Sequence, residues 1–422
     1  MSVTEAAVAG AVSGAPSRPV SFIGADQDYW RILIRGAFLL MVTLGLYRFW
    51  LATDIRRFLW AHTAIDGEPL EYSGTAMELM KGFLVAIALL LPIYTVFLIA
   101  VLDLGLLGNL LSGFAVLLLA FLSQYGIYLA RRYRLTRTVF RGLRLHQTGS
   151  AIRYAICAIW WWSLTIVTFG FAYPFNRAAL ERFKMRNTFY GDLQGRFEGS
   201  GWRLFVRGFL LWLLVMLPIL ADLSSFALID WVAATEAMRG GDDVLGRMER
   251  ASPGFLAAVG FGIIAIMTSF ILALLLLPVF HAIVTRWWVS GLRFGDMVAV
   301  SHLRTRDVYF VYLRFIGYVL LFALLLAVGI FVALFVIGLS ADTVSSEITE
   351  IISVLMLIGI YVVSALALST LYQAVVSLSV WRLTAESTEL SNTETLAHIR
   401  AAGEASSPLG EGIADILNLG GI

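Results

Sequence analysis

The chain has few of the residues on which cross-linked or metal-centred folds depend. Among its 422 residues there is 1 cysteine, Cys157, which excludes an internal disulfide framework and any site with several cysteine ligands. The 5 histidines are far apart, and none has the i, i+4 spacing of a helical metal-binding pair. Cys157 itself lies in an apolar segment and is interpreted as a small buried side chain.

Charged residues are also scarce, at 14% of the chain, whereas 59% of the residues are hydrophobic. The mean hydropathy of +0.83 is too high for a soluble domain, in which about a quarter of the residues carry charge. Several apolar runs approach or exceed the ~18–20 residues that cross a bilayer as a helix. The runs are continuous, so a transmembrane β-barrel, which alternates over segments of ~10 residues, is disfavoured. The composition therefore predicts an all-α polytopic membrane protein.

Sequence signatures of catalysis are missing as well. The chain has no glycine loop with lysine for binding phosphate and no nucleophile-elbow pattern. We therefore predict no catalytic residue, no cofactor and no metal, and do not expect an enzyme. The first residues also lack the basic start and apolar core of a cleaved signal peptide, and are interpreted as a disordered tail.

The apolar residues group into eight segments that define the predicted organisation. These segments are 31–51, 78–102, 104–130, 152–175, 203–229, 254–288, 308–339 and 350–382. The predicted parts are a disordered tail (1–21), a first membrane repeat (22–130), a second membrane repeat (131–288), a C-terminal membrane hairpin (289–382) and a cytoplasmic polar tail (383–422).

Arginines in the loops decide how these segments cross the membrane. The loops on both sides of segment 152–175 are rich in arginine, and both are expected to be cytoplasmic by the positive-inside rule. This is possible if segments 31–51 and 152–175 enter the bilayer and return, so that six helices cross and both termini are cytoplasmic. Eight full crossings are the alternative, and they would place one arginine-rich loop outside.

Glycine and proline mark the points at which the two re-entrant segments would turn. Gly45 and Gly170 tolerate backbone conformations closed to other residues, and Pro174 cannot continue an upstream helix. Irregular backbone at membrane depth must be covered by protein or line a wet cavity, so these turns are expected to face other helices. Three further prolines are predicted helix kinks: Pro92, Pro218 and Pro278.

Matches between distant parts of the chain predict an internal duplication. Gly45 matches Gly170 at an offset of 125 positions (45 to 170), and after one inserted residue Gly82 matches Gly208. We therefore predict two parallel repeats. Each repeat also contains a short polar stretch with strand-like alternation. Four such stretches are predicted to pair into a small cytoplasmic sheet: 66–74, 141–145, 191–199 and 290–294.

Charges within or beside the apolar segments are the candidate functional residues. Arg35, Asp222 and Arg314 fall inside predicted spans, where burial of a charge is costly. They are predicted to form a polar path between the repeats; the alternative is that they lie at the headgroup interfaces. A second, arginine-rich set is predicted to bind anionic lipid headgroups rather than nucleic acid: Arg131, Arg132, Arg134 and Arg137.

The chain resembles one known family in several motifs. They are Phe22-Ile23-Gly24 before Tyr29-Trp30, the Thr43-Leu44-Gly45-Leu46-Tyr47 break, Arg56-Arg57-Phe58, and the stretch from Gly67 through Glu71-Tyr72-Ser73-Gly74-Thr75 to Gly82-Phe83. In these motifs the sequence is similar to the YjgN-like bacterial inner-membrane proteins, a family of unknown function. The closing GEGIADILNLGGI also resembles the family's tails. The resemblance implies an inner-membrane location and brings no catalytic residues.

Two functions follow as hypotheses. The first is a transporter or lipid-handling protein with a polar path between the repeats. The second is a non-catalytic membrane scaffold whose cytoplasmic basic loops recruit a partner or anionic lipids. The sequence indicates neither a protein partner nor an oligomeric state.

Overall fold

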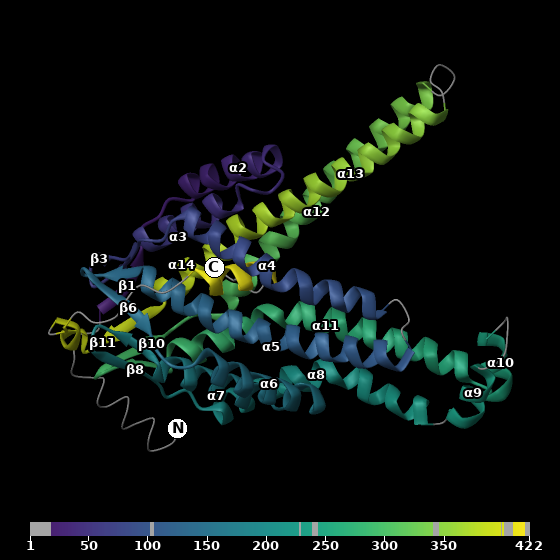
Figure 1. Ribbon diagram of the computed structural model, residues 1–422, viewed down its shortest axis with the longest axis horizontal. Helices are drawn as coiled ribbons and strands as arrows, with labels where there is room; N and C mark the ends of the chain where they lie inside the picture. The colour runs from purple at the N-terminus through teal and green to yellow at the C-terminus, as the bar shows by residue number, and fades with distance from the viewer. Residues whose placement is uncertain are drawn as a thin grey trace.

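The structure is a computed structural model that describes residues 18–101, 105–227, 229–238, 244–340, 346–397, 399–400 and 408–417. The strands gather at one end of the molecule, and the long helices project away from them (Figure 1). Of the predicted disordered tail (1–21), residues 1–17 lie outside the described residues, whereas 18–21 belong to the first strand, β1 (Arg18–Phe22).

The strands form one antiparallel sheet of 11 strands in the order β3-β2-β1-β11-β10-β9-β8-β7-β6-β5-β4. The two end strands, β3 and β4, are separated along the chain by the single residue Leu70, so the sheet is an almost closed ring. The strands are β1 (Arg18–Phe22), β2 (Thr63–Ile65), β3 (Glu68–Pro69), β4 (Glu71–Tyr72), β5 (Thr138–Phe140), β6 (Leu143–Gln147), β7 (Thr188–Tyr190), β8 (Leu193–Phe197), β9 (Leu292–Phe294), β10 (Met297–Ser301) and β11 (Thr388–Ser391).

This ring corrects the predicted fold class. The prediction of an all-α protein with only short accessory strands is wrong, because the described chain also forms an antiparallel sheet of 11 strands that is almost a closed ring. The four predicted polar stretches do lie in this sheet, but six of its strands were not anticipated: β1, β2, β5, β7, β10 and β11. Each strand has only two to five residues, so its period-2 pattern is weak beside the long apolar runs.

Connections at the two rims of the ring differ. At one rim, neighbouring strands are joined by tight turns; in two of these, Asp66-Gly67 and Arg141-Gly142, both residues have positive φ. Two consecutive positive φ values are typical of the type I′ hairpin turn, whose twist matches that of the strands. At the other rim, the connections are pairs of helices.

Each helical connection leaves the ring and returns to it, because the strands on either side of it are paired with each other. Five such connections occur in the described part of the chain. They are α2 (Asp26–Val42) with α3 (Arg48–Ala61); α4 (Ala76–Val101) with α5 (Gly105–Arg137); α6 (Ala151–Val167) with α7 (Tyr173–Arg186); α8 (Gly201–Ala227) with α9 (Trp231–Met238), α10 (Val244–Ala251) and α11 (Phe255–Val289); and α12 (Thr305–Ser340) with α13 (Ser346–Leu371), the π-helix η1 (Tyr372–Ser377) and α14 (Leu378–Glu386).

Six of these helices are long and apolar enough to cross a membrane: α4, α5, α8, α11, α12 and the continuous α13–η1–α14. Most of their large apolar side chains are exposed, as expected for helices surrounded by lipid. The α12–α13 pair diverges from the bundle of α4, α5, α8 and α11 (Figure 1). The predicted segments 31–51 and 152–175 are each divided into two shorter helices by a turn; their re-entry into a bilayer stays a prediction.

The two turns have the same backbone geometry. Leu44 and Gly45 have φ values of 50° and 90°, and Phe169 and Gly170 have 47° and 85°. A positive φ is readily adopted by glycine but disfavoured for leucine and phenylalanine, so the sharp reversal must be held by its surroundings. Pro174 lies in the first turn of α7, where its missing N–H has no helical partner to lose.

A threonine fixes each of these turns. The Oγ1 atoms of Thr43 and Thr168 accept hydrogen bonds from the backbone N–H of Tyr47 and Ala172, each at 3.0 Å. Both hydroxyls also donate to the carbonyl four residues earlier, at 2.7 and 2.8 Å. The matched turns agree with the 125-position offset, but a duplication of the chain stays a prediction.

The three predicted kinks lie inside α4, α8 and α11. Pro92, Pro218 and Pro278 each sit within a helix that continues on both sides of the proline. Pro278 is buried. The positions are those expected, and a bend at any of them stays a prediction.

Candidate functional site

The ring of strands encloses a cavity of ≈ 920 Å³ that reaches the ends of α3, α11 and α14. This volume is near the upper end of the ~300–1,000 Å³ found for small-molecule pockets. Aliphatic and aromatic side chains form most of the wall, and the described lining residues include no aspartate, glutamate, lysine or arginine. Its polar groups are the hydroxyl, amide, imidazole and indole groups of a few side chains.

Threonines provide several of these polar groups, at the points where helices become strands. Thr63, Thr138 and Thr388 line the cavity, and each is the first residue of its strand. Each Oγ1 donates to the carbonyl four residues earlier, at 2.7, 2.9 and 2.6 Å respectively. The last carbonyls of a helix have no partner within the helix, so these bonds satisfy one of them at each junction. Thr188 does the same at β7, at 2.8 Å.

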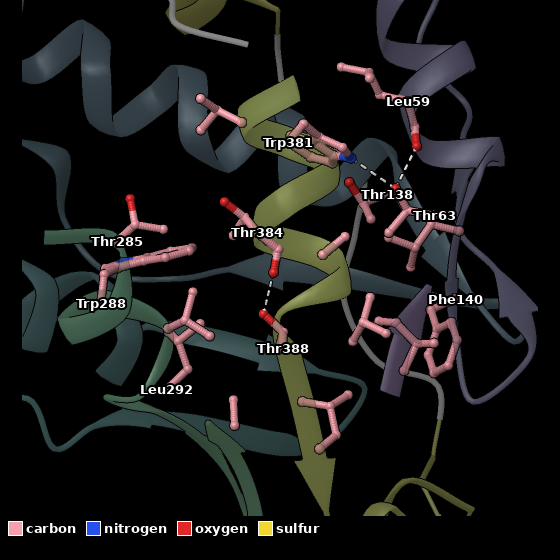
Figure 2. Close-up of a pocket in the computed structure, with 18 of the residues that line it drawn as sticks. Leu59, Thr63, Thr138, Phe140, Thr285, Trp288, Leu292, Trp381, Thr384 and Thr388 are labelled. Atoms are coloured by element: carbon pink, nitrogen blue, oxygen red, sulfur yellow. Dashed lines mark hydrogen bonds between the residues drawn. The ribbon is translucent and has the colours of Figure 1, made fainter. Parts of the chain in front are cut away.

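Two tryptophans connect these threonines across the cavity wall. The indole N–H of Trp381, on α14, donates to Thr63 Oγ1 at 2.9 Å, and that of Trp60, on α3, donates to Thr138 Oγ1 at 3.0 Å. The two indole rings lie with their centroids 5.3 Å apart. Figure 2 shows Trp381 directed toward Thr63, and α14 continuing past them into β11. The wall is therefore held by hydrogen bonds and is not a loose apolar gap.

The π-helix η1 forms part of the wall where the cavity meets the apolar helices. Turns of π-helix are rare and frequently occur at functional sites. Gln373 on η1 lines the cavity, and its Oε1 is buried without a hydrogen-bond partner among the described atoms. An unpaired buried acceptor costs about 1–3 kcal/mol, so a donor on a bound molecule would be stabilised there.

Tyr372, next to Gln373, marks the mouth of the cavity. It lines the cavity and is 44% exposed. His281 on α11 also lines the cavity, and its Nδ1 lies 3.1 Å from Tyr312 Oη on α12. His281 precedes the end of α11 at Val289 by eight residues, or about 12 Å of helix. Tyr372 itself belongs to a candidate membrane span, so the mouth lies within the apolar part of the molecule.

A buried cluster of charges lies behind one wall of the cavity, at Trp288. The indole N–H of Trp288 donates to Glu181 at 3.2 Å, and Glu181 also accepts from Lys184 Nζ at 2.5 Å. Arg177 Nη2 lies 3.8 Å from the same carboxylate. Burial opposes ionisation of Glu181, but the charges of Lys184 and Arg177 outweigh it and hold the pKa of Glu181 below its ordinary value. Burial also lowers the pKa of Lys184, an effect that Glu181 partly offsets.

The three residues predicted to form a polar path are not brought together. Arg35 is exposed on α2 and Asp222 is half-buried on α8. Arg314 is exposed on α12, where it donates to Ser379 at 3.0 Å. In the described part of the chain, no hydrogen bond or ion pair joins any two of the three, and none of them lines the cavity. Their role as a path stays a prediction.

The arginines predicted to bind headgroups lie in the last turns of α5. They are Arg131, Arg132, Arg134 and Arg137. Arg131 donates to Gln147 on β6 at 2.6 Å, and Arg137 forms an ion pair with Glu78 at 2.8 Å. Arg132 donates to a backbone carbonyl at Gly149. The guanidinium groups of Arg131, Arg132 and Arg137 thus bind the protein's own polar groups; contact with headgroups stays a prediction.

Comparison with known proteins identifies the family of the chain. The family model described as "Bacterial protein of unknown function (DUF898)" matches residues 17–274 and again residues 247–420. The chain belongs to this family. The predicted resemblance is thereby confirmed, since a relative named "Inner membrane protein YjgN" from Escherichia coli O157:H7 is 24% identical over 146 residues.

The similarity to that relative is partial. It covers 35% of this chain and 34% of the relative, so the chain matches about a third of the relative's length. No solved structure matches the chain. The family and the six apolar helices confirm a membrane protein of unknown activity, and its function has to be argued from the site.

The cavity was not predicted from the sequence. Its wall combines residues from both ends and the middle of the chain, for example Val20, Tyr190 and Leu396, which share no local pattern. One signal was available: a threonine begins a strand within two residues of the end of a helix at Thr63, Thr138, Thr188 and Thr388.

Proposed function

We propose that the protein binds a lipid-like apolar molecule in the cavity of the strand ring, and that it handles such molecules at the bacterial inner membrane. The observation that carries this proposal is the large, charge-free lining of the cavity at the base of the apolar helices. An ion or charged solute would lose its hydration shell there without gaining a partner of opposite charge. An apolar ligand gains about 25 cal/mol for each Å² removed from water.

The polar groups of the wall define the chemistry of the ligand further. Gln373 offers an acceptor that has no partner among the described residues, and the threonine hydroxyl oxygens offer further weak accepting capacity. These groups favour a long apolar molecule with one neutral hydrogen-bond donor, such as the free hydroxyl group of a diacylglycerol. The mouth at Tyr372 supports entry from the bilayer, because it lies within the apolar part of the molecule.

Filling the cavity tests this proposal. Thr285 and Ala299 line it on α11 and β10, so the double substitution Thr285→Phe with Ala299→Phe adds two rings to the space. We expect lipid retained through detergent purification, measured by native mass spectrometry, to fall about tenfold, the effect of 1.4 kcal/mol of lost binding free energy. The control is Ile316→Phe on the exposed face of α12. Equal lipid retention in both proteins would favour the scaffold hypothesis, since the cavity would then hold no ligand.

We further propose that the strand ring faces the cytoplasm, together with both termini. The arginine-rich loops that follow the positive-inside rule belong to the ring and its helical junctions. Reporter fusions at Gln147, on β6, and at Asp192, in the β7–β8 turn, are expected to give cytoplasmic signals. A fusion at Asp230, beyond the far end of α8, is expected to give a periplasmic signal. Opposite signals at Gln147 and Asp192 would contradict this orientation.

A further inference from the structure

A second cavity, of ≈ 470 Å³, lies apart from the first, between the α6–α7 turn, α8 and α11. Its described lining has no charged residue. Seven of the lining residues are aromatic: Trp162, Phe171, Tyr173, Phe205, Phe209, Trp212 and Phe280. Gly208 also lines it, seven residues or about 10 Å from the start of α8. Because α8 and α11 are candidate spans, this cavity lies at the depth of lipid chains.

The cavity is held open by specific contacts. The indole N–H of Trp212 donates to the carbonyl of Phe169, in the α6–α7 turn, at 2.8 Å. The ring of Phe171 lies edge-on to those of Phe205 and Trp212, with centroids 4.8 and 5.5 Å apart. The turn is thereby fixed on α8. Next to this fixed turn, Phe169 is 78% exposed, so the cavity adjoins the apolar surface.

In the first predicted repeat, the corresponding surface of α4 and α5 is covered by another part of the chain. There the short helix α15 (Leu409–Ile416) packs across α4 and α5. Gly412 of α15 lies against the backbone of Gly82, so close that a Cβ on either glycine would collide with the other segment. Ile413 is fully buried, and Asp415 forms an ion pair with Arg48 at the start of α3.

Of the residues that hold α15, the glycine has a counterpart at the second cavity and the arginine does not. Gly82 matches Gly208 and the neighbouring Phe83 matches Phe209, but Arg48 matches Tyr173, 125 positions further along (48 to 173). The close approach that glycine permits is kept, whereas the charged partner for Asp415 is replaced by an aromatic side chain. A helix such as α15 would lose the ion pair of its aspartate there, because none of the described lining residues is basic. An uncharged chain meets no such cost.

We infer that this second cavity binds an acyl chain of a membrane phospholipid. The rings and the glycine give a surface that a flexible hydrocarbon chain can follow with many dispersion contacts, each worth about 0.1–0.2 kcal/mol. The chain would lie along α8 in the position that α15 occupies along α4. The inference is independent of the proposed function, since the two cavities share no described lining residue.

Gly208→Leu is the direct test, because a Cβ at Gly208 meets nothing within 4 Å and the side chain can enter the cavity without moving backbone. The protein is reconstituted in vesicles of phosphatidylcholine that carries a diazirine on one acyl chain. After illumination, cross-linked peptides are mapped by mass spectrometry. We expect cross-links at Phe205 and Trp212 in the unaltered protein and about tenfold fewer in Gly208→Leu, as for a site weakened by 1.4 kcal/mol.

Matched controls keep this result interpretable. Gly317→Leu, on α12, also meets open space and should leave cross-linking at α8 unchanged, as should the double variant of the first cavity. An unchanged thermal midpoint in Gly208→Leu shows that the variant is folded. Equal cross-linking in Gly208→Leu and Gly317→Leu would overturn the inference. So would a disulfide that links two copies through Gly208→Cys of one and Ile413→Cys of the other, because α15 of a second copy would then occupy the cavity.

Discussion

Replacing Glu181 with glutamine is expected to lower the thermal midpoint of the purified protein strongly, by a loss of about 3–5 kcal/mol of stability. Glu181 is 3% exposed and is the acid among three buried or half-buried bases, Arg131, Arg177 and Lys184. Glutamine has nearly the same shape but no charge, so the three cations would remain next to one another without compensation. The measurement is thermal unfolding in detergent, followed by tryptophan fluorescence.

The stability difference between the unaltered protein and Glu181→Gln should also depend on pH, in a direction set by the pKa of Glu181. The pKa of Glu181 is held below its ordinary value, so its contribution is present above the ordinary carboxyl pKa and is lost as pH falls through the folded-state pKa. The difference in midpoint between the unaltered protein and Glu181→Gln should therefore be full at neutral pH and shrink below about pH 4.

Glu198→Gln is the matched control for this prediction. The Glu198 side chain is 61% exposed and pairs with Arg293 at 3.1 Å, so solvent screens the pair. Its loss is expected to change stability by less than about 1 kcal/mol. Equal midpoint shifts in Glu181→Gln and Glu198→Gln would show that the buried cluster does not depend on its carboxylate.

The second large effect is expected at the crossing of α4 and α15. In Gly82→Leu, the new side chain would overlap the backbone of Pro408 and displace α15 from its groove. Overpacking of this kind costs about 1–3 kcal/mol, enough to release an eight-residue helix from its place. A cysteine introduced at the fully buried Ile413, in a Cys157→Ser background, should then change from protected to fully reactive toward a thiol reagent.

The same substitution at Gly208 separates this steric effect from any general effect of leucine in the helix. Gly208 occupies the matching position on α8 but meets open space, so Gly208→Leu should leave the cysteine at position 413 protected. Protection that persists in Gly82→Leu would mean that α15 can dock without the close glycine contact.

The sequence carries the local features of this fold and little of its long-range order. The apolar runs, the φ-demanding glycines at 45 and 170, and the alternating stretch around Asp66-Gly67 are written in short patterns, and the structure has helices, turns and strands at those positions. Closure of the ring cannot be predicted from such patterns, because β1 pairs with β11 through residues such as Arg18 and Leu390, which lie at opposite ends of the chain. No local pattern specifies a partner that distant.

The candidate site could not be predicted from the sequence for the same reason. Arg131 sits among arginines at the end of an apolar run and was interpreted as a headgroup contact, yet its guanidinium binds Gln147 and Thr188, which the ring brings beside it. Gln373 shows nothing unusual in the sequence; its significance comes from a π-turn and a cavity formed by distant strands. Such sites require the tertiary structure, because their chemistry depends on which groups are left without partners.

The pairing of β1 with β11 also has a consequence for biosynthesis. A ribosome delivers β1 first, and β2 can pair with one of its edges soon afterwards, but the partner for its other edge emerges only when Thr388–Ser391 has been made. Until then β1 and β10 each present an unsatisfied strand edge, which is a template for pairing with another chain. A nascent chain that stalls before Thr388 would therefore expose two unpaired strand edges, prone to aggregation, after its membrane helices have been made. Synthesis of the short strand β11 ends this stage, because β11 pairs with both exposed edges.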